Sequence, residues 1–449
     1  MHIDFLLKVF QENLKSEFIV WHNRTYTYEW LQDKITFWTE EVISRGIKPG
    51  AVVVLEGDFS PNSIALFLAL VRYQCIIVPL TVHNEDTIRE YNEIAQADCV
   101  FKIDMQDNVT FSGFMRKAAH HYYKQLRNEK HPGLVLFSSG STGTSKAAVH
   151  DCVRLLEKYK TKRHNLRTLT FLLYDHIGGL DTLFYSLSNG SCIITVQDRS
   201  PDTVCKAIQD FAVEVLPVSP SFLNFLILSQ AYARYNLSSL KYITYGAEVM
   251  PETTLRRCHE LFPNITLLQK FGATEVGTLR SKSKASDSTW VKIGGEGYTV
   301  RVVDGILHIK ADSAILGYLN APSPFTEDGW FITGDLVEVD GEYMKILGRE
   351  KEIINVGGEK VNPAEVENVI YELNNINEVS VYGEKNAILG NIICAKISLI
   401  EPEDNTACID RVQSYCESRL ENHKVPMKIT IVDYKLHRNR FKKMRRQCN

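Results

Sequence analysis

Short apolar runs alternate with amphipathic stretches in this sequence, and that alternation constrains the fold more than any other feature. Residues 50–55 and 75–79 are apolar runs of strand length, and residues 61–73 between them carry an apolar stripe at helical spacing. Strand–helix–strand units of this kind predict a parallel sheet that is covered on both faces. A helix is also expected over residues 26–45, where Thr27 is a suitable N-cap and Glu29 lies in the first turn.

The alternation continues after residue 133. Strands are predicted over residues 133–137, 169–173, 192–196, 213–218, 242–244 and 266–268. Helices are predicted over residues 177–188, 202–211, 220–234 and 251–261. Residues 84–130 are polar and mixed, and they predict no particular element. The regular order of the other elements predicts the α/β class.

The pattern changes from Trp290 onward, where short strands and tight turns predict a small β-rich region. The pairs Asp304-Gly305 and Asp340-Gly341 are typical of hairpin turns. A further region begins with a loop near Gly348 and predicts a compact α+β unit. Its helices are expected over residues 364–373 and 408–421, and its strands over residues 378–382, 391–398 and 428–432.

The composition is ordinary for a globular chain of 449 residues, with 44% hydrophobic and 23% charged residues. The net charge of −3 gives no reason to expect nucleic acid or an anionic membrane as partner. The first residues lack the pattern of a signal peptide, and the longest apolar run, residues 64–71, is too short to span a membrane. The ten cysteines lie far apart, from Cys75 to Cys448, so we expect free, mostly buried thiols and a cytoplasmic location.

Residues 138–146, directly after the predicted strand at 133–137, combine several hydroxyl side chains with two glycines and a lysine. Glycines let backbone N–H groups approach an anion closely, and the hydroxyls and lysine add donors. The stretch is not a Walker A loop, because two residues separate Gly143 from Lys146 and Ala147 follows the lysine. A flexible linker is the alternative. The position between two apolar runs favours a phosphate-binding loop.

Four further stretches place polar residues or glycines near strand ends, namely residues 173–179, 271–275, 332–335 and 348–367. Loops at the carboxyl ends of parallel strands are where ligands bind in such sheets. Each stretch also has an ordinary structural interpretation. Glycine-rich strand ends usually form turns, and an aspartate after glycine is usually a solvated turn residue. A single histidine such as His176 is more often packed than catalytic.

The five stretches together, in this order and spacing, resemble the adenylate-forming superfamily of acyl-CoA synthetases, nonribosomal peptide adenylation domains and luciferases. The resemblance extends over residues 25–446. It implies a large N-terminal domain, residues 1–350, with parallel α/β subdomains and a small β-rich subdomain, and a small mobile α+β C-terminal domain, residues 351–449. It also implies a two-step reaction: a carboxylate attacks the α-phosphate of ATP to give acyl-adenylate and pyrophosphate, and a phosphopantetheine thiol then takes the acyl group.

The resemblance also implies a role for each motif. Thr274 would contact the α-phosphate, Glu275 would bind Mg²⁺, and His176, beside Gly178 and Gly179, would lie near the substrate carboxylate. Asp335 and Arg349 would contact the ribose. The residues implied to bind ATP are Ser138, Ser139, Gly140, Ser141, Thr142, Gly143, Thr144, Lys146, Gly246, Ala247, Glu248, Phe271, Gly272, Ala273, Asp335 and Arg349.

The resemblance gives roles to the C-terminal region as well. Lys351 falls on the hinge position, Gly357 and Gly358 on the thiol tunnel, and Lys443 on the lysine that neutralises the carboxylate and the α-phosphate. Spacing favours Lys443, although Lys442 stands where the family usually has glycine and remains a candidate. The chain departs from the family elsewhere too: His437 and Ser145 each replace the usual proline, and Ala147 replaces the usual glycine.

The loop Val356-Gly357-Gly358-Glu359 resembles the form found in acyl-CoA synthetases. His176 lacks a clear acidic neighbour for an α-ammonium, which argues against an amino acid substrate unless Asp175 faces the pocket. We therefore expect a small acyl or aryl carboxylic acid as substrate, and CoA or a phosphopantetheinyl carrier protein as acceptor. A non-catalytic nucleotide-binding protein and an oxygen-dependent oxidative enzyme are the alternatives. The basic tail has no aromatic platform for nucleic acid.

Overall fold

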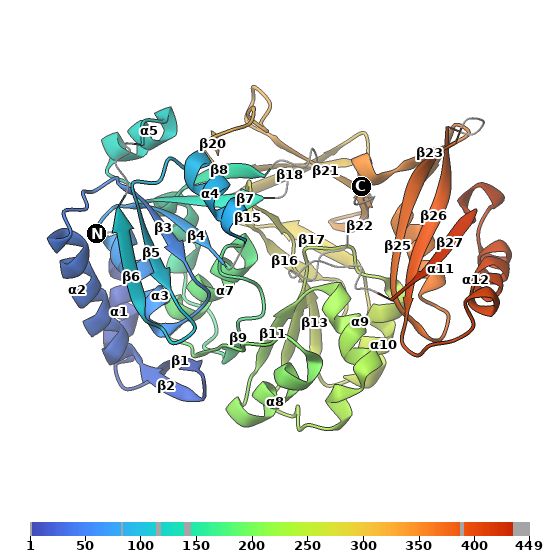
Figure 1. Cartoon of the computed structure of the whole chain (residues 1–449), viewed down its shortest axis with the longest axis horizontal. Helices are drawn as coiled ribbons and strands as arrows, with labels where there is room; N and C mark the ends of the chain where they lie inside the picture. The colour runs from blue at the N-terminus through green and yellow to red at the C-terminus, as the bar shows by residue number, and fades with distance from the viewer. Residues whose placement is uncertain (1, 82–83, 114–117, 139–144, 387–389, 434–449) are drawn as a thin grey trace.

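A computed structural model describes residues 2–81, 84–113, 118–138, 145–386 and 390–433 (Figure 1). The α/β class is confirmed, because two large sheets are mainly parallel and carry helices on their faces. The first sheet, in spatial order, comprises β20 (Gly317–Tyr318), β8 (Lys146–Asp151), β7 (Gly133–Ser138), β4 (Ile76–Leu80), β3 (Val52–Glu56), β5 (Cys99–Ile103) and β6 (Val109–Gly113). Its centre is parallel, whereas β6, β8 and β20 pair antiparallel at the two edges.

The second sheet is parallel from one edge to its penultimate strand, and only β2 pairs antiparallel. In spatial order it comprises β13 (Thr266–Gln269), β12 (Tyr242–Tyr245), β11 (Val215–Val218), β9 (Thr168–Leu169), β10 (Ile193–Ile194), β1 (Glu17–Trp21) and β2 (Arg24–Thr27). Loops at the carboxyl ends of these strands supply several of the predicted site residues.

Helices fill the space between the two sheets and cover their outer faces. The described helices of this part are α1 (Asp4–Glu12), α2 (Tyr28–Ser44), α3 (Pro61–Arg72), α4 (Glu85–Ile94), α5 (His121–Glu129), α6 (Cys152–Leu156), α7 (Ile177–Ser188), α8 (Pro201–Phe211), α9 (Pro220–Ser229) and α10 (Glu252–Leu261). Helix α3 is buried almost all round, and Phe67 on it packs against Tyr174 and Phe184. Burying each such side chain contributes about 1.5–3 kcal/mol.

A third, antiparallel sheet forms the β-rich region, in the order β16 (Arg280–Ser283), β17 (Trp290–Gly294), β22 (Tyr343–Arg349), β21 (Phe331–Asp340), β19 (Ile306–Ala311) and β18 (Tyr298–Val303). Both predicted hairpins are confirmed. Val303 pairs with Ile306 across Asp304 and Gly305, which both have positive φ as this turn requires. Asp340 pairs with Tyr343 in the second hairpin.

The elements after β22 gather at one side of the molecule, in orange and red (Figure 1). They are the hairpin β23 (Ile354–Val356) and β24 (Glu359–Val361), helices α11 (Pro363–Ile370) and α12 (Asn405–Arg419), and the sheet of β25 (Ile376–Asn386), β26 (Gly390–Leu399) and β27 (Lys428–Val432). They share their own apolar core. The Asn224 side chain of α9 donates to the Asn377 carbonyl oxygen (2.9 Å), which links this unit to the second sheet.

Several element boundaries differ from the sequence-based expectation. Residues 84–130 contain two helices and two strands, α4, β5, β6 and α5. Strand β9 is Thr168–Leu169, so it shares only Leu169 with the strand expected over residues 169–173. Helix α9 ends at Ser229, because Gln230 adopts a left-handed conformation with φ of 49°. Thr27 caps α2 as expected, its side chain accepting from the Trp30 N–H.

The cysteine prediction is confirmed for nine of the ten residues, which are free and buried; Cys448 lies outside the described residues. No helix in the described part of the chain combines the length and the apolar composition that crossing a membrane requires.

Candidate active site

The β7–β8 hairpin carries the two ends of the predicted phosphate-binding loop. Ser138 pairs with Lys146 across the two strands, so the two described ends of the predicted loop lie side by side. Of the predicted loop, Ser139, Gly140, Ser141, Thr142, Gly143 and Thr144 lie outside the described residues. The described end residues, Ser138 and Lys146, are both partly exposed. They place a hydroxyl and a cation beside each other.

Ser145, which departs from the family pattern, is held by two distant residues. Its hydroxyl lies 2.8 Å from the Tyr91 hydroxyl, and its carbonyl oxygen accepts from the Asn320 side chain at 2.8 Å. The side-chain Oδ1 of Asn320 also accepts from the Ala147 N–H at 3.0 Å. The Tyr91 ring stacks on Phe137 with centroids 3.9 Å apart. These contacts fix the chain where it enters β8.

Lys146, Tyr318 and Glu275 form a contact group beside the loop. The Lys146 ammonium lies 5.1 Å from the Tyr318 ring centroid, and the Tyr318 hydroxyl donates to Glu275 Oε1 at 2.5 Å. Burial, and then the neighbouring Glu275 carboxylate, raise the pKa of Tyr318, so this tyrosine stays a donor. One oxygen of Glu275 is therefore held in place. A partly exposed carboxylate in this position fits a hard divalent cation such as Mg²⁺.

The predicted segment 271–275 has a buried beginning and a more open end. Phe271 packs in the core of the β-rich region. Gly272 and Ala273 form β14 and pair with β15 (Gly277–Thr278), where a side chain at Gly272 would approach the Gly277 carbonyl oxygen within 2.9 Å. Thr274 and Glu275 follow and are partly exposed.

His150 on β8 is fully buried close to the Thr274 backbone. Its ring nitrogens form no well-aligned hydrogen bond with the described residues, although the Thr274 backbone is near enough to favour the charged form slightly. Desolvation dominates and lowers the pKa of His150 to about 4. The imidazole is therefore neutral at physiological pH, and its role here is packing.

The turn after β12 brings Gly246, Ala247 and Glu248 to the carboxyl edge of the second sheet. A Cβ at Gly246 would lie 2.6 Å from the Lys270 carbonyl oxygen, so only glycine allows this close approach of two backbones. Ala247 has φ of +69°, a strained value for a residue with a side chain. Glu248 accepts from the Ser221 hydroxyl at 2.6 Å, which joins the turn to the start of α9.

His176 caps α7, because its Nδ1 accepts from the Gly178 N–H at 3.1 Å. In this bond Nδ1 acts as an acceptor. A Cβ at Gly179 would lie 2.0 Å from the Leu173 carbonyl oxygen, so glycine is required for the first turn to pack there. Asp175 is buried, and its Oδ2 accepts from the Thr81 hydroxyl at 2.8 Å. At least one oxygen of this carboxylate is therefore held by the fold.

Three charged residues that the sequence analysis did not single out lie near α7. Lys158 Nζ contacts Asp181 Oδ1 at 2.5 Å and the Thr278 carbonyl oxygen at 2.7 Å. Lys270 directly follows β13. Surrounding protein desolvates its ammonium group and lowers its pKa; Lys158 adds to this lowering and Asp181 opposes it.

Asp335 and Arg349 lie opposite each other on β21 and β22. Arg349 Nε contacts Asp335 Oδ1 at 2.6 Å, and Arg349 also donates to the Thr333 carbonyl oxygen at 3.0 Å. The Asp335 side chain is 10% exposed and that of Arg349 is 53% exposed. The aspartate of this pair is thus largely buried, whereas the arginine side chain remains accessible to solvent.

The remaining predicted residues lie on the C-terminal side. Lys351 is exposed in the short helical turn Glu350–Glu352. Gly357 and Gly358, with φ of 60° and 99°, form the two-residue turn of the β23–β24 hairpin. Lys442 and Lys443 lie outside the described residues, so the geometry does not decide between them.

Tyr318 and Asn320 could have been found from sequence only weakly. They belong to the two-residue strand β20 and its continuation, which have no glycine-rich or charged motif. Pairing of β20 with β8, about 170 positions earlier in the chain, brings them to the loop. Lys270 offered a better signal, because it directly precedes the Phe271-Gly-Ala-Thr-Glu275 stretch.

Comparison with known proteins matches two family models to this chain. The model described as AMP-binding enzyme matches residues 8–306, and the model described as AMP-binding enzyme C-terminal domain matches residues 365–443. An indoleacetate–CoA ligase from Aromatoleum aromaticum is 28% identical, over 67% of this chain and 64% of that protein. The match thus takes in less than two thirds of the relative's length.

Two further similarities extend over nearly the whole chain. A 2-succinylbenzoate–CoA ligase from Listeria innocua is 24% identical over 94% of this chain and 95% of its own. The crystal structure of an anthranilate CoA ligase in complex with anthranoyl-AMP superposes with a TM-score of 0.83 at 18% identity, covering 99% of this chain and 95% of that one. At this identity the structural likeness shows the fold alone.

Proposed function

Because this chain belongs to the AMP-binding enzyme family, we propose that it activates a carboxylic acid with ATP and transfers the acyl group to CoA. In the first step a carboxylate oxygen attacks the α-phosphorus, an acyl-adenylate forms and pyrophosphate leaves. In the second step a thiol sulfur attacks the acyl carbonyl, a thioester forms and AMP leaves. The contact group of Lys146, Tyr318 and Glu275 carries the proposal.

That group supplies the charges that the first step needs. The transition state spreads negative charge over phosphoryl oxygens, and the Lys146 ammonium next to the phosphate loop offsets part of it. Glu275 would hold Mg²⁺, which when bound neutralises charge on the phosphates. The bond from Tyr318 keeps the Glu275 carboxylate oriented, and Thr274 beside it would donate to the α-phosphate. In the proposal, Lys443 adds a second cation from the small domain.

The N-terminus of α7 supports the proposal that the carboxylate of the acid substrate binds there. The N-terminus of a twelve-residue helix carries a partial positive charge and favours an anion. His176 stands at this end, where its Nδ1 accepts from the helix, and its ring would approach the substrate carboxylate. Thr81 holds one oxygen of the buried Asp175 carboxylate, which argues against its use as an anchor for an α-ammonium. We therefore propose an acyl or aryl acid without an amino group next to the carboxylate.

The nucleotide and the second domain complete the proposal. The Asp335–Arg349 pair would contact the ribose hydroxyls, the partly exposed arginine giving access from solvent. Lys351 would be the pivot between residues 1–350 and 351–449, and Gly357 and Gly358 would line the path of the thiol. A carrier protein is the alternative acceptor. Nine buried free thiols support a reducing, cytoplasmic location.

Carboxylate-dependent exchange of labelled pyrophosphate into ATP tests the first step. The acids in the panel should begin with indoleacetate, 2-succinylbenzoate and anthranilate, because related proteins carry these names. We expect exchange with at least one aryl or acyl acid and thioester formation when CoA is added. Holo carrier protein in place of CoA separates the two acceptors. If no acid supports exchange although ATP binds, the chain is a non-catalytic nucleotide-binding protein.

A further inference from the structure

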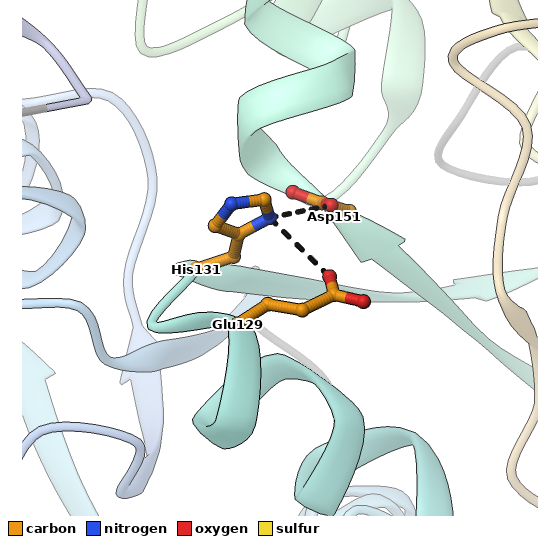
Figure 2. Close-up of side chains that lie close together, drawn as sticks. All are labelled: Glu129, His131 and Asp151. Atoms are coloured by element: carbon orange, nitrogen blue, oxygen red, sulfur yellow. Dashed lines mark hydrogen bonds and ion pairs between the residues drawn. The ribbon is translucent and has the colours of Figure 1, made fainter.

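A second cluster of charged side chains lies at the other end of the β7–β8 hairpin, outside the proposed active site. Glu129 ends α5, His131 lies in the connection to β7, and Asp151 ends β8 (Figure 2). His131 Nδ1 lies 2.8 Å from Asp151 Oδ2 and 3.5 Å from Glu129 Oε2. One ligand atom from each of the three side chains lies within 4.8 Å of the others. We infer that these three residues form a site for a divalent transition metal, zinc.

The distances suit tetrahedral zinc. Zinc binds histidine nitrogen and carboxylate oxygen at about 2.0–2.2 Å, so neighbouring ligand atoms in a tetrahedron lie about 3.3 Å apart. The two distances at His131, 2.8 and 3.5 Å, lie on either side of that value. Zinc would therefore need little movement of His131 relative to either carboxylate, and the ligand oxygens of the two carboxylates lie within 4.8 Å of each other. Imidazole nitrogen favours zinc over magnesium, which prefers six oxygen ligands.

The backbone positions the three ligands before any metal arrives. Lys130 has a left-handed conformation with φ of 55°, and it turns the chain so that Glu129 and His131 point to the same side (Figure 2). Asp151 is held by helix α6, because its Oδ1 accepts from the Val153 N–H at 2.8 Å and caps that helix. Its Oδ2 is directed at His131. A site whose ligands are already oriented loses little conformational entropy on binding.

Charge and burial also favour a cation here. The Asp151 side chain is fully buried, whereas those of Glu129 and His131 are 37% and 26% exposed and leave a path for an ion. Two carboxylates outnumber the one imidazole. Arg154 Nε lies 3.4 Å from Asp151 Oδ2, but its side chain is 51% exposed and can turn to solvent. The His2 ring packs edge-on against His131, with centroids 5.3 Å apart, and covers one side of the cluster.

The same distances would also arise from a metal-free hydrogen-bonded group of one histidine and two carboxylates. Zinc titration distinguishes the two. Tag-free full-length protein is stripped with chelator and titrated with Zn²⁺ by calorimetry in excess Mg²⁺, which occupies the proposed magnesium site at Glu275. We expect one zinc per chain, a higher melting temperature with zinc, and at least ~10-fold weaker binding in Glu129→Gln and in His131→Gln.

His423→Gln is the matched control. His423 also contacts a carboxylate, Glu421, at 3.4 Å, but no third ligand joins them in the described part of the chain. We expect its zinc affinity to equal that of the wild type. Glu129 is an exposed helix-end residue, so its variant folds even if that of His131 is destabilised. Absence of zinc binding by the wild type, or equal binding by Glu129→Gln, overturns the inference.

Discussion

The two ends of the β7–β8 hairpin differ in how their polar groups are satisfied. At the loop end, Ser138 and Lys146 are partly exposed, and the Lys146 ammonium contacts only a ring face among the described residues. At the other end, the buried Asp151 carboxylate accepts from the Val153 N–H and contacts His131. One end leaves its polar groups partly exposed, whereas the other ties a buried carboxylate to the α6 cap and to His131. Substitutions should therefore change activity at the first end and stability at the second.

The largest effect is expected from Lys443, which lies outside the hairpin. In the proposal its ammonium acts on the same substrate phosphates as the loop end of the hairpin. Lys443→Ala should lower the rate of adenylate formation by about 10³-fold, because one fixed positive charge near the phosphorus is lost. Thioester formation from pre-made acyl-adenylate should continue. Lys442→Ala is the matched control and should retain most of the exchange rate. If Lys443→Ala forms adenylate at the wild-type rate, Lys443 is not the catalytic lysine.

Lys146→Gln tests the loop end itself. We expect kcat/KM for pyrophosphate exchange to fall by about 100-fold, because the ammonium no longer offsets phosphate charge. The free energy of unfolding should change by only about 0.5 kcal/mol, the usual scale for a cation over a ring at a partly exposed site. Lys130→Gln, at the other end of β7, is the control and should leave exchange unchanged. An equal loss of kcat/KM in both variants would show that the two ends of the hairpin do not differ in their effect on activity.

How far the sequence predicts this arrangement depends on the range of the interactions. Thr27 as a cap and the Asp304-Gly305 turn were predicted because a few neighbouring residues determine them. Residues 84–130 were not, because α4 and α5 are short and bury only a narrow stripe among many polar residues, Tyr91 and Ala95 at α4 and Tyr123 and Leu126 on α5.

The candidate site shows the same division. The loop, the segment 271–275 and the Asp335–Arg349 pair could be proposed from the sequence, because each is a compact motif or part of one. Tyr318 could not, because a strand of only two residues brings it from far along the chain to Lys146 and Glu275. The zinc inference depends in the same way on Asp151 meeting a connection some 20 residues earlier.

His150, between the two ends of β8, should make stability depend on pH. Its pKa is lowered from 6.5 to about 4 by burial, so between these values the unfolded chain binds a proton that the folded chain does not. Stability should therefore fall as the pH falls, by about 2 kcal/mol between about pH 7.5 and about pH 5. Urea unfolding of the wild type and of His150→Asn measures this contribution. An unchanged pH slope in the variant would show that His150 is not the group responsible.

The smallest effect is expected from Asp151→Asn, at the end of the β7–β8 hairpin away from the loop. It is measured with chelator present so that no metal contributes. Asparagine still caps α6, but its amide group replaces a charged acceptor that faces His131, so the free energy of unfolding should fall by about 1 kcal/mol. Asp404→Asn is the control, because Asp404 also caps a helix, α12, without a histidine partner in the described structure. A difference between the two variants isolates the His131 contact. If both variants lower the free energy of unfolding equally, the Asp151 end of the hairpin is stabilised by the helix cap alone. The contrast between the two ends of the hairpin is then weaker than the geometry indicates.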